Sequence, residues 1–368
     1  MVNNLENVTD IIASPKDKQE VRVLPRPKAE FEIGSRIVPA RGKESISSQN
    51  PVVLIREDLK VAFPIIDGVP VLLAPEVLHP PDCHIEVNLN DPKYEEAYEE
   101  MDFYNEVASE EARNIENSQA FRVIEPVWNA CQENVQSFPT PRQIWLDSVY
   151  DCAAQWDAYK HISPIKGKRV LQMGGKGAHA VKFLLGGASE AWVVTPMIGE
   201  VRCAVALAEM VGVGDKLKCV VAVAEELPFV ERSFDIVFSG GSLHHTRTER
   251  SITEVHRILR DNGRFAATDP WRAPLYSVGT AIFGKREPNV YCRPLTEERV
   301  KPVRKTFSSS SVEQHGTLTR YPLLALKKLG LSFSQDTVWK LNKMDDAVCS
   351  LIPRFREMGS SVACLGTK

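Results

Sequence analysis

The sequence predicts an α/β fold in which a mostly parallel sheet is covered by helices and is preceded by a smaller α+β subdomain. Three observations lead to this fold class. Short apolar runs alternate with segments of helical periodicity between residues 166 and 269. A glycine-rich turn connects the first of these runs to a helical segment. Upstream, Asp67-Gly68 separates two apolar runs, which is a strong signal for a β-hairpin. Strands that alternate with helices form a parallel sheet with helices on both faces.

The residues before 140 divide into two predicted parts. Residues 1–30 are polar and include three prolines, so we expect a flexible lead-in. Residues 31–139 are predicted to form the N-terminal subdomain, with a β-hairpin at Asp67-Gly68 and helices over the charged segment 92–137. The hairpin is expected there because glycine accepts a positive φ angle at little steric cost.

Residues 140–368 are predicted to form the main domain, which begins with a helix over 142–161. An apolar stripe on this helix comprises Trp145, Val149, Cys152, Trp156 and Tyr159. Their spacings of three and four residues place them on one helix face. The stripe indicates either core packing or an aromatic wall over the active site. In the second case Trp156 and Tyr159 would contact the substrate.

Strands and helices are then predicted in alternation. The five predicted strands are 168–174, 190–195, 218–224, 234–240 and 263–269, and the helices between them are 177–187, 199–211 and 249–260. The segment 272–316 is less regular and is predicted to be a substrate-side insertion. The last predicted elements are helix 319–329, strand 331–340, helix 344–358 and strand 361–367.

The glycine-rich turn is the first candidate for ligand binding. Gly174, Gly175 and Gly177 follow a strand and precede a helix. Glycines let a ligand approach the backbone closely, and a helix N-terminus offers free N–H groups. The pattern is typical of nucleotide-binding folds in general.

A more specific signal lies between residues 224 and 265. This run contains Leu227-Pro228-Phe229, Ser233-Phe234-Asp235 and Leu243-His244-His245, and it ends with Gly263-Arg264 before a strand. It resembles the class I S-adenosylmethionine-dependent methyltransferases that modify small molecules, and the resemblance covers about residues 165–270. The resemblance implies a Rossmann-like sheet with an antiparallel last strand, S-adenosyl-L-methionine as the cofactor, and methyl transfer as the activity.

The resemblance also implies which residues contact the cofactor. They are Gln172, Gly174, Gly175, Gly177, Thr195, Glu200, Ala224, Glu225, Ser239 and Gly240. Three of the family's usual acids are replaced here, by Gln172, Thr195 and Val223. Because Thr195 stands where an acid usually binds the ribose hydroxyls, we expect Glu200 to take over that contact. A degenerate domain that serves as a scaffold is the alternative.

The acceptor side is expected after the fourth and fifth strands. His244 and His245 are the candidate catalytic residues, as positioning groups or as a base, since imidazole titrates near neutral pH. The candidate substrate-binding residues beyond the fifth strand are Trp271, Arg272, Tyr276 and Arg293. Arginine combined with aromatic side chains suits a small carboxylate that carries an apolar or cationic part.

Three functions follow from these residues. The GGKGAHAVKFLL and DPWRAPLY segments are similar to the methylthiohydroxybutyrate S-methyltransferases of dimethylsulfoniopropionate synthesis. This similarity implies S-methylation of a small thioether carboxylate, which needs no base. The second function is O- or N-methylation of a natural product or quinone-like ring with a histidine base. The third is a non-catalytic scaffold that binds a partner through the N-terminal hairpin.

The composition limits the partners, metal sites and cellular location that we expect for this chain. A net charge of −3 and a pI near 6.3 disfavour nucleic acid as a substrate. No apolar run reaches the roughly 20 residues of a membrane helix. The eight cysteines are scattered without a CxxC pair, so we expect a reducing cytoplasmic location and no metal site. A small-molecule substrate is the expected partner, and a homodimer is left open.

Overall fold

A computed structural model of the chain describes most of the 368 residues. The described residues are 10–15, 18–25, 52–56, 62–73, 92–133, 137–148, 152–274, 276, 278, 293–331 and 333–368.

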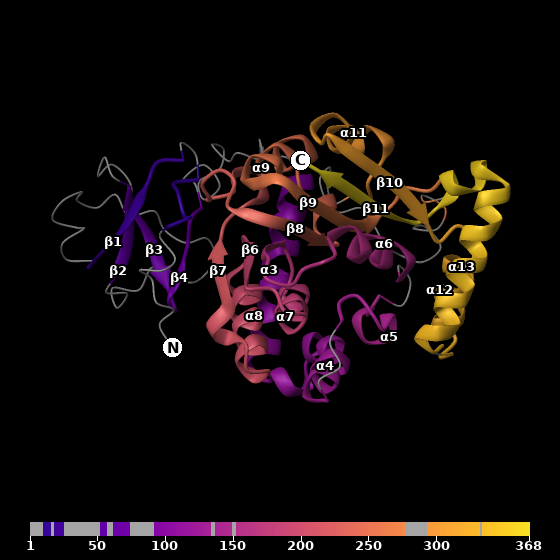
Figure 1. Cartoon of the computed structure of the whole chain (residues 1–368), viewed down its shortest axis with the longest axis horizontal. Coiled ribbons are helices and arrows are strands. Elements are labelled where there is room, and N and C mark those ends of the chain that lie inside the picture. Colours follow the sequence, from indigo (N-terminus) through magenta and orange to yellow (C-terminus); the bar gives the residue numbers. More distant parts are fainter. Residues whose placement is uncertain are drawn as a thin grey trace.

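The main domain is built on a seven-stranded sheet with the order β10-β11-β9-β8-β5-β6-β7 (Figure 1). The strands are β5 (Arg169–Met173), β6 (Glu190–Thr195), β7 (Leu217–Val221), β8 (Phe234–Gly240), β9 (Leu259–Pro270), β10 (Ser309–His315) and β11 (Ser361–Thr367). β5 to β9 are parallel, and β11 runs antiparallel to both of its neighbours. The predicted fold class, including the antiparallel last strand, is confirmed.

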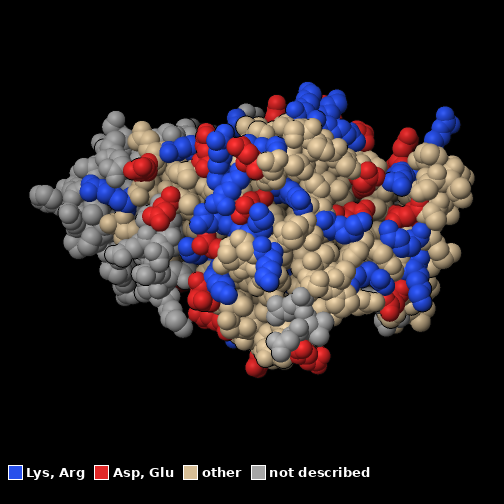
Figure 2. All heavy atoms as spheres, in the orientation of Figure 1, with Lys and Arg blue, Asp and Glu red and all other residues tan. Residues whose placement is uncertain are grey.

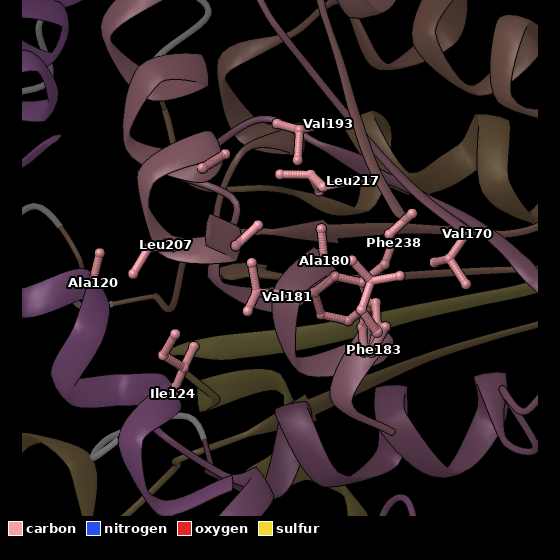
Figure 3. Close-up of a cluster of buried hydrophobic side chains, with 14 of the residues drawn as sticks. Ala120, Ile124, Val170, Ala180, Val181, Phe183, Val193, Leu207, Leu217 and Phe238 are labelled. Atoms are coloured by element: carbon pink, nitrogen blue, oxygen red, sulfur yellow. The ribbon is translucent and has the colours of Figure 1, made fainter. Parts of the chain in front are cut away.

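Helices cover both faces of this sheet. They are α3 (Pro92–Arg113), α4 (Gln119–Gln132), α5 (Arg142–Trp145), α6 (Cys152–Ile162), α7 (Ala178–Leu185), α8 (Ile198–Met210), α9 (Thr248–Ile258), α11 (Glu297–Thr306), α12 (Arg320–Lys328) and α13 (Gln335–Leu351). Alternate residues of each strand point to opposite faces, so the core has two parts. Val170 and Phe238 belong to one cluster, with α4, α7 and α8 (Figure 3). Leu171 and Val237 belong to the other, with α9 and α11.

A second, four-stranded sheet contains β1 (Val21–Pro25), β2 (Val52–Arg56), β3 (Ala62–Ile66) and β4 (Val69–Pro70) in that order. Asp67 and Gly68 join β3 to β4 with φ angles of 52° and 77°. Two positive φ angles are typical of a type I′ turn, and the predicted hairpin is therefore confirmed. The hairpin lies against β7, where the backbone N–H of Leu72 donates to the carbonyl oxygen of Val221 at 2.8 Å.

The start of the chain differs from the prediction of a flexible lead-in over 1–30. Ile12 and Ala13 are buried, and the backbone N–H of Ala13 donates to the carbonyl oxygen of Pro228 at 3.0 Å. Lys18 forms an ion pair with Glu254 at 2.7 Å. The prediction is wrong for the described residues 10–15 and 18–25, because the short apolar run around Ile12 finds a hydrophobic site on the main domain.

Two predicted elements of the main domain need correction. The helix expected over 142–161 is divided into α5 and α6 by a non-helical segment. The strand expected over 331–340 is wrong, because α13 begins at Gln335 after Ser334, whose hydroxyl accepts from the N–H of Thr337 at 3.2 Å. The sixth strand is instead β10, inside the segment predicted as irregular. α13 ends at Leu351, and a 3-10 helix follows over Pro353–Met358.

Candidate active site

The candidate site lies at the carboxyl ends of β5, β6, β7, β8 and β9. In open α/β sheets, ligands bind in the crevice outside these strand ends. Most of the residues predicted for the site follow one of these strands directly. The fold therefore brings them to one edge of the sheet, and the contacts at each strand end decide what each residue does.

The glycine turn after β5 is held in a conformation that favours glycine. Gly174, Gly175 and Gly177 have φ angles of 75°, 77° and 81°, which other residues rarely adopt. A Cβ at Gly174 would overlap Ser242, and a Cβ at Gly177 would overlap Ala204. A Cβ at Gly175 would meet only the side chain of Gln172, at 3.4 Å. Gly174 and Gly177 therefore permit close packing within the protein, whereas Gly175 leaves space on the outer side of the turn.

The side chain of Gln172 stabilises the glycine turn through two hydrogen bonds. Its Nε2 donates to the carbonyl oxygen of Gly174 at 2.8 Å, and its Oε1 accepts from the N–H of Ala180 at 2.7 Å. The amide thus joins the glycine turn to the first turn of α7. Both polar atoms of Gln172 are used within the chain, so its contribution to a ligand is to fix the shape of the turn.

Glu200 joins the ends of β5 and β6. Its Oε2 accepts from the Thr195 hydroxyl at 2.6 Å and from the N–H of Gly175 at 3.1 Å. Burial raises the pKa of Glu200, which is the usual result of removing a carboxylate from water. The structure therefore brings together Thr195, Glu200 and the glycine turn, the three parts expected to surround a ribose.

The end of β7 is tied to α9. Glu225 is buried, and its Oε1 accepts from the N–H of Arg247 at 2.8 Å. Burial raises the pKa of Glu225. Ala224 precedes it in the same 3-10 turn and is also buried. Glu225 thus holds the start of α9 in place, and a contact of Ala224 or Glu225 with adenine stays a prediction.

The end of β8 contains an unpaired polar group. The hydroxyl of Ser239 is buried and has no hydrogen-bond partner among the described residues. Beside it, a Cβ at Gly240 would lie 2.5 Å from Nε2 of His179. A buried polar atom without a partner is costly, and such atoms are frequent where a ligand supplies the missing partner.

His179 was not predicted as a site residue, although it directly follows the glycine turn in the first helical turn of α7. Its Nδ1 is 2.6 Å from the hydroxyl of Tyr159, which is 3.2 Å from Nε2 of Gln155. Burial is the main reason that the pKa of His179 is lowered to about 4. The position of this histidine, next to a glycine-rich turn, was the only sequence signal for it.

The two aromatic residues predicted to form a wall lie in different surroundings. Tyr159 is completely buried among the rings of Phe138, Phe183 and Phe238. This placement is core packing, so the prediction that Tyr159 lines an open acceptor pocket is not supported by its burial. Trp156 is partly buried and packs against Trp339 of α13, with 5.8 Å between ring centres. Val149 lies outside the described residues.

The rings of His244 and His245 lie close together at the acceptor side, tilted by 41° with 4.0 Å between their centres. Nδ1 of His244 is 2.7 Å from Oδ1 of Asp269, which also accepts from the backbone N–H of His244 at 3.0 Å. The other oxygen of Asp269 has no hydrogen-bond partner among the described residues. For His245, burial and the charges of His244 and Arg299 lower the pKa to about 3. His244 is therefore the histidine that is oriented by Asp269, and His245 stays neutral.

The residues that follow β9 lie on the acceptor side of the site. Trp271 is buried, and its backbone N–H donates to the carbonyl oxygen of Ser360 at 2.9 Å. The guanidinium of Arg272 lies 5.5 Å from the centre of the Tyr276 ring. Arg293 is partly exposed, at the start of the chain segment that leads into α11. The insertion predicted over 272–316 lies partly outside the described residues, which omit 279–292.

Arg299 of α11 is a further residue that the sequence did not indicate. Its Nη2 donates to the carbonyl oxygens of His244 and Thr246 at 2.9 and 3.0 Å. These bonds hold the turn that carries both histidines. Arg299 lies more than 50 residues from them in the sequence, so only the packing of α11 against α9 reveals the contact.

Helix α3 of the N-terminal part reaches the same edge. Oδ1 of Asn105 accepts from the N–H of Gly199 at 2.7 Å, at the start of α8. Glu111 forms an ion pair with Lys176 of the glycine turn at 2.7 Å. The helix therefore contacts two of the elements that surround the proposed ribose position.

Residues 169–267 match the methyltransferase domain family. This region of the chain is similar to a methyltransferase domain. The matched region begins with β5 and includes the glycine turn, the end of β8 and the turn that carries His244 and His245. It ends within β9, just before Asp269. The strand ends described above therefore lie in or next to the matched region, whereas α3, α11 and the residues after β9 lie outside it.

Curated relatives match parts of this chain. A tRNA U34 carboxymethyltransferase from Hydrogenovibrio crunogenus is 32% identical over 125 residues, which are 33% of this chain and 38% of that protein. A sarcosine/dimethylglycine N-methyltransferase from Aphanothece halophytica is 37% identical over 60 residues, which are 16% of this chain and 22% of that protein. The chain thus spans less than two fifths of the length of these relatives.

Solved structures with a similar fold include the geranyl diphosphate C-methyltransferase of Streptomyces coelicolor. It has a TM-score of 0.44 and 13% identity, over 59% of this chain and 78% of that chain. The YcgJ protein of Bacillus subtilis has a TM-score of 0.42 and 22% identity, over 59% of this chain and 97% of that chain. Within the part of the chain that the structure describes, no helix is both long and apolar enough to span a membrane.

Proposed function

We propose that the chain is an S-adenosylmethionine-dependent methyltransferase that acts on a small molecule. The observation that carries this proposal is a pair of hydrogen bonds to the Glu200 carboxylate. One comes from Thr195 at the end of β6, and the other comes from Gly175 in the glycine turn. A carboxylate at this position suits a pair of ribose hydroxyls. The match to the methyltransferase domain family over residues 169–267 supports the same cofactor.

The residues present fit such a cofactor. Gly175 leaves space above the turn, and the buried hydroxyl of Ser239 lacks a partner among the described residues. Glu200 and Thr195 would hold the ribose, and Ala224 and Glu225 would flank the adenine. When bound, the cofactor supplies an activated methyl group on sulfur. The protein's contribution is to align the acceptor with it, because alignment can supply much of the rate enhancement.

For the acceptor, we favour a group that loses a proton, such as a hydroxyl. The contact between His244 and the buried Asp269 is the observation that favours it. A carboxylate that orients an imidazole also stabilises the charge that forms when the imidazole accepts a proton. In this reaction His244 would receive the acceptor's proton as the acceptor oxygen forms its bond to the methyl carbon, and the bond from that carbon to the cofactor's sulfur would break at the same time.

The thioether carboxylate, which is the first of the three functions expected from the sequence, becomes the second candidate. The guanidinium of Arg272 beside the Tyr276 ring suits a small carboxylate with an apolar or cationic part. One relative is named for tRNA, so the exclusion of nucleic acid also stays a proposal. Acidic side chains lie among the basic ones on the face in Figure 2. A continuous basic surface would be expected for a polyanion.

Calorimetry with S-adenosylmethionine tests the cofactor, with two matched glycine variants. Gly175→Ala and Gly212→Ala place a Cβ on residues with nearly equal φ angles of 77° and 76°, so the backbone strain is similar. Gly212 follows α8 at the opposite end of that helix from Glu200, and a Cβ there meets no atom within 4 Å. We expect only Gly175→Ala to weaken binding. Absence of binding to the wild-type chain would instead support the scaffold.

The pH dependence of turnover separates the two acceptors. With a hydroxyl acceptor, His244→Gln should lower turnover by about 10²–10⁴-fold, the usual contribution of a positioned base. His245→Gln is the control, because the pKa of His245 is lowered to about 3 and this ring does not titrate near neutral pH. A profile that is flat in the wild type and in both variants would support the thioether.

A further inference from the structure

His179 is a third histidine at the carboxyl ends of the strands, besides His244 and His245. It lies in the first turn of α7 and faces the end of β8, because a Cβ at Gly240 would lie 2.5 Å from its Nε2 and 2.8 Å from its Cδ2. The ring is enclosed by Tyr159, Phe183 and Phe238, with ring centres 4.7–6.4 Å away. These contacts leave the imidazole little freedom to turn.

The hydrogen bonds around Gln155 decide which nitrogen of His179 carries its proton. Oε1 of Gln155 accepts from the N–H groups of Asp147 and Ser148 at 3.0 and 3.1 Å. The amide nitrogen of Gln155 must therefore face the side-chain oxygens of Asp147 and Tyr159. Because the Tyr159 hydroxyl accepts from Gln155, its own proton is available for Nδ1 of His179, at 2.6 Å.

The neutral imidazole consequently carries its proton on Nε2. Burial lowers the pKa of His179 to about 4, so that the ring is neutral at pH 7. Burial also raises the pKa of Tyr159 well above its ordinary value, which keeps the hydroxyl proton in place. With Nδ1 accepting, Nε2 is the donor. The network therefore presents an N–H group to the end of β8.

A buried ion pair fixes this network to the fold. Nζ of Lys182 is 3.0 Å from Oδ2 of Asp147, and it donates to the carbonyl oxygen of Trp145 at 2.9 Å. Lys182 is completely buried. Since Asp147 also accepts from Gln155, the segment before α6, α6 itself and α7 are joined by one set of polar contacts.

The order of the strands indicates what the N–H group meets. Under the proposed function, the ribose lies at the end of β6, beside Thr195 and Glu200. The neighbouring strands β5 and β8 then lie under the amino-acid part of the cofactor. The start of α7 favours an anionic group there. Lys176, the cation of the glycine turn, is paired with Glu111. The nearby partner for the carboxylate of the cofactor is therefore a neutral N–H donor.

We propose that Nε2–H of His179 donates a hydrogen bond to the carboxylate of the amino-acid part of S-adenosylmethionine. This inference rests on the proposed function. His179 is a cofactor-positioning residue in this role, and no proton is transferred. By fixing the amino-acid end, it directs the sulfonium methyl group away from α7 and toward the His244 side of the sheet edge.

Two probes that share a nucleoside test the contact. S-Adenosylhomocysteine has the amino-acid part, and 5′-methylthioadenosine lacks it. In calorimetry, His179→Ala should weaken binding of S-adenosylhomocysteine by about 10- to 100-fold, the usual effect of losing a hydrogen bond to a charged group. Binding of 5′-methylthioadenosine should not change. His179→Gln, which keeps an N–H donor, should recover part of the affinity.

His161→Ala is the matched control. Nε2 of His161 contacts the carbonyl oxygen of Gly366, away from the carboxyl ends of the parallel strands where the site lies. We expect its affinities to equal those of the wild type. Nitrogen NMR of His179 gives an independent measurement, with the proton expected on Nε2. The inference is overturned if His179→Ala weakens binding of both probes equally, or of neither. If the wild-type chain binds neither probe, the proposed function fails first.

Discussion

His179 and His315 lie in two enclosed regions of the same domain, yet their charges differ at neutral pH. Burial disfavours the charged form of both rings. Around His179 the direct partner is the Tyr159 hydroxyl, and the pKa is lowered to about 4. Around His315 the partners are two carboxylates, Asp157 at 3.1 Å and Asp346 at 3.0 Å, and they raise the pKa to about 9 against the effect of burial.

The difference teaches that the partner, rather than burial, decides the charge of an enclosed histidine. The groups around the two histidines also have different roles. The charged cluster around His315 connects β10, α6 and α13, with Lys343 pairing with Asp346 at 2.8 Å. The network around His179 keeps a neutral donor beside the sheet edge and places its full charges deeper, on Asp147 and Lys182.

The largest expected effect comes from Lys182→Met. This change leaves Asp147 enclosed without its cation, and we expect the free energy of unfolding to fall by about 3–5 kcal/mol. Lys168→Met is the control, because Lys168 is 46% exposed and 3.6 Å from Asp235, and an exposed pair contributes about 0–1 kcal/mol. Urea denaturation measures both. Equal losses in the two variants would show that the neutral network does not depend on the buried pair.

Replacing the charged histidine should cost less. His315→Gln leaves Asp157 and Asp346 facing each other without the cation, and we expect a loss of about 1–3 kcal/mol at pH 7. The folded-state pKa near 9 lies above the ordinary value near 6.5. The contribution of His315 is therefore complete below pH 6.5 and is lost as the pH rises through 9. Wild type and variant should converge in stability above pH 9, and a constant difference would contradict the charged state.

The neutral histidine predicts the opposite pH dependence. Its folded-state pKa near 4 lies below the ordinary value, so the unfolded chain binds a proton first as the pH falls from 6.5 to 4. His179 should therefore destabilise the fold progressively over this range. Thermal unfolding should show a smaller loss of stability on acidification for His179→Gln than for the wild type. Parallel curves for the two proteins would contradict the neutral assignment.

The smallest effect is expected from Tyr159→Phe. The ring still fills its place among Phe138, Phe183 and Phe238, but the hydroxyl between Gln155 and His179 is lost. We expect the free energy of unfolding to fall by about 0.5–1.5 kcal/mol, as for one neutral hydrogen bond. NMR should then show His179 with its proton distributed over both nitrogens. A proton that stays on Nε2 alone would mean that Tyr159 does not determine it.

Parts of the fold were predictable because their cause is local. The strands β5, β6 and β8 each contain a short apolar run, as expected of parallel strands buried on both faces. β10 has the sequence SSSVEQH and was missed, because an outer strand with partly exposed side chains has little apolar signal. The alternation of Leu331 and Phe333 with polar residues suggested a strand where α13 begins nearby.

The site was predictable to the extent that strand ends position it. Thr195 and Glu200 were expected together because one ends a strand and the other begins the next helix. His179, and the contact of Arg299 with the His244 turn, were missed because they depend on packing between distant segments. The separate states of His244 and His245 were also beyond the sequence, since only the fold shows that Asp269 faces His244.

The two edges of the main sheet are protected in different ways against pairing with another chain. The protection of β7 by the hairpin has the larger consequence. β10, at one edge, carries serine and charged side chains that discourage pairing with another chain. β7, at the other, has the mostly apolar sequence LKCVV, and its end is covered by Val71 and Leu72, the two residues that follow β4. A chain shortened to residues 140–368 would expose that edge. We expect such a chain to self-associate, which size-exclusion chromatography would detect.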